Sequence, residues 1–243
     1  MPDLLSDLLD ALRGAGRVVA LTGSGVSAES GVPTFREAQT GLWERFDPQE
    51  LATPEAFARD PRLVWDWYEW RRGLVKRAEP NAGHLALAEL ERRLPASTLV
   101  TQNVDGLHQR AGSSEVIELH GNILRSKCSL EGTMVEDYDP AERPPPCPRC
   151  GAPLRPDVVW FGEALPVAAF EAVSEAARAC DLLLSVGTSS LVYPAAALPF
   201  EALDNGAVLV EVNPDETPLT AHADHVLRGP AGEVLPRLVA AIL

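Results

Sequence analysis

His120 is the first residue of this chain whose type and position suggest chemistry. It ends the apolar run VIELH and precedes Gly121, which places it at the end of a predicted buried strand. A neutral imidazole can take a proton from a sugar hydroxyl near pH 7, so His120 is a candidate general base. The alternative is a structural histidine, the commoner role of a single histidine.

A glycine-rich segment, TGSGVSAESGVPTFR at residues 22–36, follows the apolar run Val18 to Leu21. The letters GSGVSA fit G-x-G-x-x-G/A, in which glycines let the backbone approach a pyrophosphate at a helix start. A turn without a ligand is the alternative. A dehydrogenase would carry another strand and an acidic residue about 20 residues later. Residues 37–80 contain no convincing strand, so the pattern fits a dehydrogenase poorly.

Three more polar segments follow predicted strands. VTQNVDGLHQRAG would place Gln102, Asn103 and Asp105 at a strand end, where open α/β sheets bind ligands. Helix capping by Asn103 and Asp105 is the alternative interpretation. GTSSLVYP and VNPDE, at residues 187–194 and 212–216, offer backbone groups and hydroxyls of the kind that hold a nucleotide.

The cysteines suggest a metal site. Cys147 and Cys150 form a C-P-R-C pair with the spacing of a metal knuckle, and Cys128 lies upstream. Four cysteines in 243 residues do not resemble the disulfide framework of a small secreted protein. Cys180, in the apolar run RACDLLLSV, is expected to be a buried packing residue.

A helix is predicted to begin at Asp60 as N-cap and Pro61 as first residue, and it contains DWYEWRRGLV at residues 66–75. At about 100° per residue, Arg71 falls in the middle of the apolar arc. A buried guanidinium needs an anion, which could be a carboxylate of the protein or of a ligand. An internal salt bridge or extension to solvent is the commoner outcome. Arg72, near the edge of the arc, is expected to face water.

Short apolar runs alternate with amphipathic helices along the chain. The predicted strands are Val18 to Leu21 and residues 98–102, 116–120, 182–188 and 207–213; the predicted helices are Leu4 to Leu12 and residues 82–93, 103–111, 167–179 and 194–204. This alternation predicts an α/β fold with a doubly wound, parallel, Rossmann-like sheet.

Two stretches interrupt the alternation and predict a second, smaller lobe. They are residues 37–80, which are helical, and residues 122–156, which carry the clustered cysteines. The Rossmann-like domain is then expected to comprise residues 1–36, 81–121 and 157–243.

Composition excludes some classes of function. The hydrophobic content of 46% is globular, and no apolar run is long enough to span a bilayer. The first residues, MPDLLSDLLDALRG, carry acids where a signal peptide carries basic charge, so we expect a soluble, cytoplasmic protein that has no membrane partner. The net charge of −14 argues against nucleic acid as a partner.

Taken together, the motifs resemble the sirtuin family of NAD-dependent protein lysine deacylases. GSGVSAESGVPTFR, TQNVDGLH, ELHG, C-x2-C, VVWFGE, GTSSLVYP and VNP occur in the family's order and spacing over nearly the whole chain. Ser24 stands where alanine is usual, and Thr34 where many members have aspartate. The resemblance implies a Rossmann-like NAD-binding domain with a smaller zinc-binding and helical lobe.

The resemblance also implies that NAD is consumed as a co-substrate. The amide oxygen of an acyl-lysine attacks the ribose carbon as nicotinamide leaves, and His120 is the general base that lets a ribose hydroxyl attack the resulting imidate. The products are free lysine, nicotinamide and O-acyl-ADP-ribose. The residues implied to bind NAD are Gly23, Ser24, Gly25, Ala28, Glu29, Thr34, Phe35, Arg36, Gln102, Asn103, Val104, Asp105, Gly187, Thr188, Ser189, Asn213, Pro214, Asp215 and Ala231.

The motif VVWFGE is implied to bind the substrate. Val159, Phe161, Gly162 and Glu163 would pair with the substrate backbone as an added strand and wall the lysine tunnel. The expected partners are therefore acylated lysine side chains of proteins. The sequence predicts neither the protein substrates nor the oligomeric state.

The family's zinc module needs four ligands, and this chain matches three of them. Cys128, Cys147 and Cys150 occupy the implied ligand positions, while Glu131 stands where a fourth cysteine is expected. Zinc with Glu131, zinc with another donor, and no metal are the three outcomes considered. A three-cysteine zinc site with an unsettled fourth donor is preferred, because carboxylates are less usual ligands in structural sites.

Tyr68 and Arg71 have the Y-x2-R spacing of family members that resemble acidic deacylases. Succinyl- and malonyl-lysine end in a carboxylate that a bidentate arginine and a tyrosine hydroxyl suit. We therefore expect a preference for these groups with some deacetylation. The alternatives are an enzyme that is mainly a lysine deacetylase, an NAD-dependent Rossmann-type oxidoreductase, and a non-catalytic binding module built on the zinc knuckle.

Overall fold

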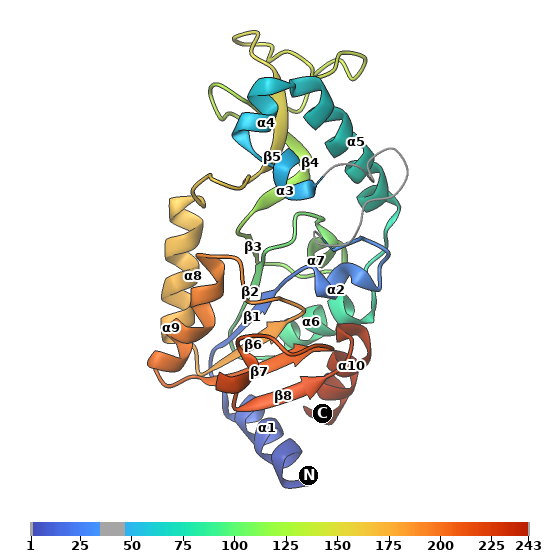
Figure 1. Ribbon diagram of the computed structural model, residues 1–243. Coiled ribbons are helices and arrows are strands. Elements are labelled where there is room, and N and C mark those ends of the chain that lie inside the picture. Colours follow the sequence, from blue (N-terminus) through green and yellow to red (C-terminus); the bar gives the residue numbers. More distant parts are fainter. Residues whose placement is uncertain (1, 35–46, 243) are drawn as a thin grey trace.

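A parallel six-stranded sheet forms the larger part of the molecule (Figure 1). The structure is a computed structural model, and it describes residues 2–34 and 47–242. The strand order is β3-β2-β1-β6-β7-β8, and every neighbouring pair is parallel. The strands are β1 (Val18–Thr22), β2 (Ser97–Thr101), β3 (Val116–Glu118), β6 (Leu182–Val186), β7 (Val208–Asn213) and β8 (His225–Arg228). This is the doubly wound order: β2 and β3 are added on one side of β1, and β6, β7 and β8 on the other, so the strand order reverses between β1 and β6.

Helices cover both faces of this sheet, which confirms the predicted fold class. The first face is covered by α1 (Pro2–Gly14), α6 (Ala82–Arg93) and α10 (Ala231–Ile242), and the second by α8 (Val167–Ala179) and α9 (Leu198–Asp204). Along β1, Val18 and Ala20 belong to the core under the first face, and Val19 and Leu21 to the core under the second. Both faces of the sheet are buried, which is why its central strands β1 and β6 are largely apolar along their whole length.

A second, smaller sheet lies at the top of Figure 1 with three helices beside it. Its antiparallel strands are β4 (Gly121–Cys128) and β5 (Leu154–Val158), and the helices are α3 (Pro48–Leu51), α4 (Pro54–Arg59) and α5 (Pro61–Arg77). Each helix starts with proline after a residue whose side chain accepts a backbone N–H bond, namely Asp47, Thr53 or Asp60. The expected N-cap at Asp60 is thus confirmed, while the residue boundaries of the two lobes stay a prediction.

Two of the differences between the predicted and the observed elements lie at the site. The helix expected at 103–111 is reduced to α7 (Leu107–Arg110), because Asn103 and Asp105 bond to Ser27 and Gly106 adopts a left-handed φ of +69°. The strand expected at 116–120 ends at Glu118, since the chain turns at His120 and Gly121 to enter the small sheet. Both differences occur where the chain leaves the sheet to build polar loops.

No described helix, within residues 2–34 and 47–242, has the length and apolar character that crossing a membrane requires.

Candidate active site

Two glycine-containing loops meet where β1 and β6 end, at the point where the strand order reverses. The backbone N–H of Gly25 donates to the carbonyl oxygen of Gly187 over 2.8 Å. A Cβ on Gly23 would lie 2.8 Å from that carbonyl oxygen, and one on Gly187, whose φ is +58°, would lie 2.5 Å from the nitrogen of Val26. Only glycine fits these positions, so bare backbone is presented at these strand ends and can approach a pyrophosphate closely.

A buried polar network stands beside the first loop. The hydroxyl of Ser27, in the short helix α2 (Gly25–Ala28), donates to Asp105 Oδ2 over 2.7 Å and accepts from Asn103 Nδ2 over 3.0 Å. His84 Nε2 lies 3.3 Å from the same hydroxyl, and His84 Nδ1 accepts from the backbone N–H of Asn81. Burial raises the pKa of the Asp105 carboxyl, although bonds from Leu107 and Ser27 oppose that shift. The sequence predicted Asn103 and Asp105 here but gave no sign of Ser27 and His84 as their partners.

Side-chain amides tie together the ends of three strands, β2, β6 and β7. Gln102 Nε2 donates to the hydroxyl of Thr188 over 3.1 Å, and Asn213 Nδ2 donates to the carbonyl oxygen of Thr188 over 2.8 Å. Segments after β2, β6 and β7 therefore converge on Thr188. The structure thus brings together the polar segments that the sequence predicted at successive strand ends.

His120 faces the same group of loops. Its Nδ1 lies 2.9 Å from the carbonyl oxygen of Gln102, and burial lowers its pKa. Since a carbonyl oxygen can only accept, Nδ1 carries the proton and Nε2 keeps its lone pair. The neutral imidazole is therefore held in the tautomer that a general base needs.

The other described residues expected at the cofactor lie in or beside these loops. Ser24, Ala28, Pro214 and Asp215 are exposed, Val104 and Ser189 are half-buried, Ala231 is buried at the start of α10, and Thr34 is half-buried. The carboxylate of Glu29 accepts the backbone N–H of Gly232 over 2.7 Å, which joins the first loop to α10. Phe35 and Arg36 lie outside the described residues.

The segment VVWFGE lies between the two sheets and alternates in exposure. Val159 N donates to the carbonyl oxygen of His120, and Phe161 N donates to that of Ala52, both over 2.9 Å. Phe161 is 41% exposed, whereas Trp160 between them is 2% exposed. Gly162 is exposed, and Glu163, although half-buried, is bound by Arg155. Residues 159 and 161 therefore keep side-chain surface available, while their pairing with a substrate strand stays a prediction.

Tyr68 and Arg71 share one side of α5. The Tyr68 hydroxyl accepts from Trp160 Nε1 over 2.9 Å, and burial raises its pKa to about 12. Arg71 is half-buried, lies over the Trp67 ring with 5.1 Å between Cζ and the ring centroid, and lines a small pocket with Val32, Pro33, Trp70, Leu74 and Val75. Burial lowers the pKa of Arg71, and the negative potential of Tyr68 and Asp105 opposes the shift. The Arg71 cation and the Tyr68 hydroxyl thus lie close enough to interact, and the Asp105 carboxyl also acts on Arg71.

Arg72 is buried, so the expectation that it faces water is wrong. Its side chain is 3% exposed and donates to the carbonyl oxygens of Ile123 and Arg125, to the Ser126 hydroxyl and to Glu69. The register of β4 against β5 shifts between Asn122 and Ser126, and this shift leaves those carbonyls for another donor. A helical wheel drawn for α5 alone could not reveal that β4 packs against the edge of the apolar arc, where Arg72 lies.

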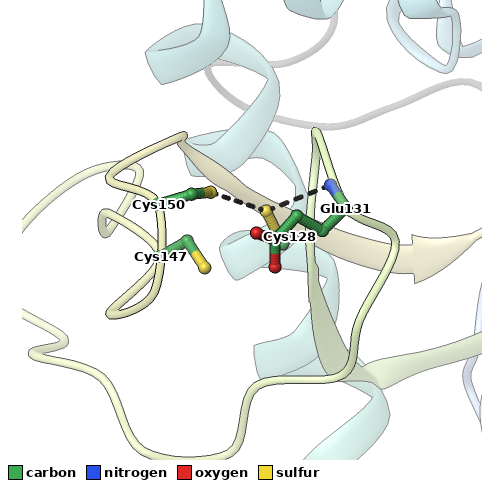
Figure 2. A group of neighbouring side chains, drawn as sticks. All are labelled: Cys128, Glu131, Cys147 and Cys150. Atoms are coloured by element: carbon green, nitrogen blue, oxygen red, sulfur yellow. Dashed lines mark hydrogen bonds between the residues drawn. The ribbon is translucent and has the colours of Figure 1, made fainter.

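The three clustered cysteines and Glu131 form a compact donor group at the end of β4 (Figure 2). The ligand atoms of Cys128, Glu131, Cys147 and Cys150 all lie within 4.8 Å of one another. Arg149 Nε lies 3.3 Å from Glu131 Oε2, and the Thr133 hydroxyl donates to the same oxygen over 3.5 Å. Three thiols and a carboxylate at these separations suit a tetrahedral zinc ion. Cys180 is separate and buried, as expected.

Comparison with known proteins agrees with this geometry. Residues 23–194 match the model of the Sir2 family. A protein of Methylococcus capsulatus named NAD-dependent protein deacylase is 53% identical over 97% of this chain and 96% of its own length. The crystal structure of a Sir2 homologue–NAD complex superposes with a TM-score of 0.92 at 48% identity, covering 98% of this chain and 93% of its own. A Sir2–p53 peptide–NAD+ complex superposes with a TM-score of 0.87 at 33% identity, covering 97% of each chain.

Proposed function

The chain belongs to the Sir2 family of NAD-dependent protein deacylases, and from this premise we propose that it prefers acidic acyl groups, succinyl and malonyl, on protein lysine side chains. The observation that carries the preference is the placement of Arg71 and Tyr68 on one side of α5, where Arg71 lines a pocket of otherwise apolar side chains and Tyr68 is buried beside Trp160. A relative of known structure holds a peptide and NAD+ in the same fold, which supports a protein substrate.

The residue roles at the cofactor are part of this proposal. Gly23 and Gly25 would hold the pyrophosphate, Asn103 and Asp105 the nicotinamide ribose and carboxamide, and Thr188 and its neighbours the adenosine half. Bare backbone at the ends of β1 and β6 and the convergence of amides on Thr188 support this division. NAD supplies the electrophilic ribose carbon and nicotinamide as the leaving group.

His120 would act as the general base. Its Nδ1–H donates to the carbonyl oxygen of Gln102, so Nε2 can take the proton of a ribose hydroxyl. The carbonyl oxygen of His120 accepts the backbone N–H of Val159, at the start of the segment that would pair with the substrate. Base and substrate strand are thus fixed to each other through one residue.

The acyl pocket would recognise a carboxylate through two groups. Arg71 supplies a permanent positive charge and a fork of N–H donors. The Tyr68 hydroxyl accepts from Trp160, and within residues 2–34 and 47–242 no acceptor is found for its own hydrogen. A terminal carboxylate can accept from both groups, whereas the methyl end of an acetyl group can accept from neither. An enzyme that is mainly a deacetylase would gain nothing from this pair.

We also propose zinc at the cysteine cluster with Glu131 as the fourth ligand. Arg149 and Thr133 engage Oε2, which orients the carboxylate and leaves Oε1 for monodentate binding. The ion would join the turn after β4 to the C-P-R-C knuckle before β5. Its part is structural, because all four ligands come from the protein.

A peptide panel tests the proposed activity. Acetyl-, malonyl-, succinyl- and glutaryl-lysine peptides would be compared by nicotinamide release and by mass spectrometry of the deacylated peptide. We expect the highest kcat/KM for an acidic acyl group. Release with none of the peptides would contradict deacylase activity, and NAD reduction without nicotinamide release would favour the oxidoreductase alternative.

A matched pair of variants on α5 tests the acyl pocket. Arg71→Met should lower kcat/KM for the succinyl peptide by about 100-fold, the scale of a lost charge-assisted pair, and change deacetylation little. Arg77→Met, an exposed arginine on the same helix, is the control. Equal losses of both activities in Arg71→Met would refute the acyl preference without touching the deacylase assignment.

A further inference from the structure

The hydrogen bond between Trp160 and Tyr68 joins two parts of the chain that the proposed function uses separately. Trp160 lies in the segment VVWFGE, and Tyr68 lies on α5. Both side chains are 2% exposed, and the indole Nε1 is 2.9 Å from the phenol oxygen. An indole N–H can only donate, so the phenol oxygen must be the acceptor. The hydroxyl hydrogen of Tyr68 therefore has to point away from Trp160.

Trp160 is itself held firmly from two sides. The Arg155 guanidinium lies over its ring, with 3.3 Å between Cζ and the ring centroid, and Phe57 packs with a centroid separation of 5.2 Å. Arg155 forms two bonds to the carboxylate of Glu163, over 2.5 and 2.8 Å, and Glu163 Oε2 accepts the backbone N–H of Trp160 over 2.8 Å. These contacts hold the indole with its N–H toward Tyr68.

The exposure pattern of the segment couples this arrangement to substrate binding. Val159 and Phe161 keep accessible surface, while Trp160 between them points inward. The stretch after β5 thus offers Val159 and Phe161 to the outside and Trp160 to Tyr68, and it turns where the backbone N–H of Glu163 donates to the carbonyl oxygen of Trp160 over 3.0 Å. A shift of this stretch would move the indole N–H relative to the phenol oxygen.

We propose that Trp160 is a positioning residue for acyl specificity, which orients the hydroxyl of Tyr68 as a donor to the terminal carboxylate of the acyl group. This inference rests on the proposed acyl pocket. Accepting one hydrogen bond also strengthens the bond that the same hydroxyl donates, because neighbouring hydrogen bonds polarise one another. Glu163, whose carboxylate is committed to Arg155 and Trp160, serves this arrangement through its side chain.

A double-mutant cycle tests the inference. Trp160→Phe removes the N–H and keeps an aromatic ring under Arg155; Tyr68→Phe removes the hydroxyl. We expect Trp160→Phe to raise KM for the succinyl peptide roughly 3- to 10-fold, the range for loss of one neutral hydrogen bond, with the acetyl peptide nearly unchanged. In the Tyr68→Phe background the same substitution should have no further effect on desuccinylation. Trp65→Phe is the control for stability, because it removes the same volume at a buried tryptophan, which lies on α5.

The indole N–H resonance of Trp160, assigned by its loss in Trp160→Phe, gives a second readout. Tyr68→Phe should shift this resonance upfield, and a succinyl peptide should shift it where an acetyl peptide does not. Equal losses for both acyl groups, or additive effects in the cycle, would overturn the inference and leave a structural role. If Tyr68→Phe lowers desuccinylation and deacetylation equally, the proposed acyl pocket is contradicted. If the indole resonance shifts equally with succinyl and acetyl peptides, the positioning role of Trp160 is contradicted.

Discussion

The Nδ1 atom of His120 lies 2.9 Å from the backbone carbonyl oxygen of Gln102. This contact fixes the tautomer, and burial lowers the pKa of the ring below its ordinary value of 6.5. A base works only when unprotonated, so the acidic limb of the kcat/KM profile, which reports the free enzyme, should have an apparent pKa below 6.5. His120→Ala should lower deacylation by about 10²- to 10⁴-fold while NAD still binds.

The control for this prediction is His222→Ala, at an exposed histidine in the short helix Thr220–His222. It should leave kcat/KM and its pH profile unchanged. Nicotinamide release and deacylated peptide would be measured together across pH, with NAD affinity from calorimetry. A full rate in His120→Ala would remove His120 from the reaction.

Stability should fall in mild acid because two buried histidines face each other. The rings of His84 and His108 are 4.8 Å apart between centroids, and burial lowers their pKa values to about 4 and about 3. In the unfolded chain both would titrate near 6.5. The unfolded state therefore binds more protons below pH 6.5, and stability is lost as pH falls toward the folded pKa values. Each histidine should cost about 2 kcal/mol between pH 7 and pH 5.

Urea unfolding at a series of pH values measures this loss. His108→Gln should flatten the dependence of the unfolding free energy on pH, although the variant is less stable at pH 7. His225→Gln, at a partly exposed position in β8, should keep the parent's slope. An unchanged slope in His108→Gln would show that other groups govern the acid response.

The sequence predicted the sheet well because its strands are short apolar runs that end in polar or glycine-rich segments. The predicted helix at 167–179 coincides with α8 (Val167–Ala179), and the six strands include all five that were expected. β8 and α10 were not predicted, since HVLR alternates at a sheet edge and α10 has Pro236 inside it. Such elements depend on the neighbours that they pack against more than on their own pattern.

Partners within the site were harder to predict than the site's position. Strand ends located Asn103, Asp105 and His120, but nothing in the sequence linked Ser27 to Asp105 across 78 residues. Likewise, Arg155 and Trp160 carry no motif that shows one lying over the other. Contacts of this kind arise where two loops or two sheets meet, and a single sequence does not contain that geometry.

Arg72 illustrates the same limit and gives a prediction. Arg72→Met would leave the carbonyl oxygens of Ile123 and Arg125 without the donor that the shifted register of β4 requires. Unsatisfied buried acceptors and a lost pair with Glu69 should lower the free energy of unfolding by roughly 3–5 kcal/mol. Arg77→Met is the matched control on the exposed side of α5. A melting temperature equal to the parent's would show that water replaces the guanidinium.

Zinc should depend on Glu131 in a way that separates the three outcomes left open by the sequence. Its carboxylate lies within 4.8 Å of all three sulfurs, so Glu131→Ala removes a ligand. We expect a fall in zinc affinity at least as large as the roughly 10- to 100-fold typical of changes outside the ligand shell, together with a lower melting temperature. Glu131→Cys should restore binding, because a thiolate completes a four-cysteine site.

Zinc content after dialysis against a graded chelator series provides the measurement, with Glu142→Ala, an exposed acid of the same cysteine-rich stretch, as the control. Arg149→Ala tests the orientation of the carboxylate and should weaken binding less than Glu131→Ala does, because it removes only a partner of Oε2. Zinc retained with parental affinity in Glu131→Ala would assign the fourth position to another donor. A parent protein that holds no zinc would instead mean that the three thiols and the carboxylate only pack together, and the melting temperature of Glu131→Ala would then stay near the parent's.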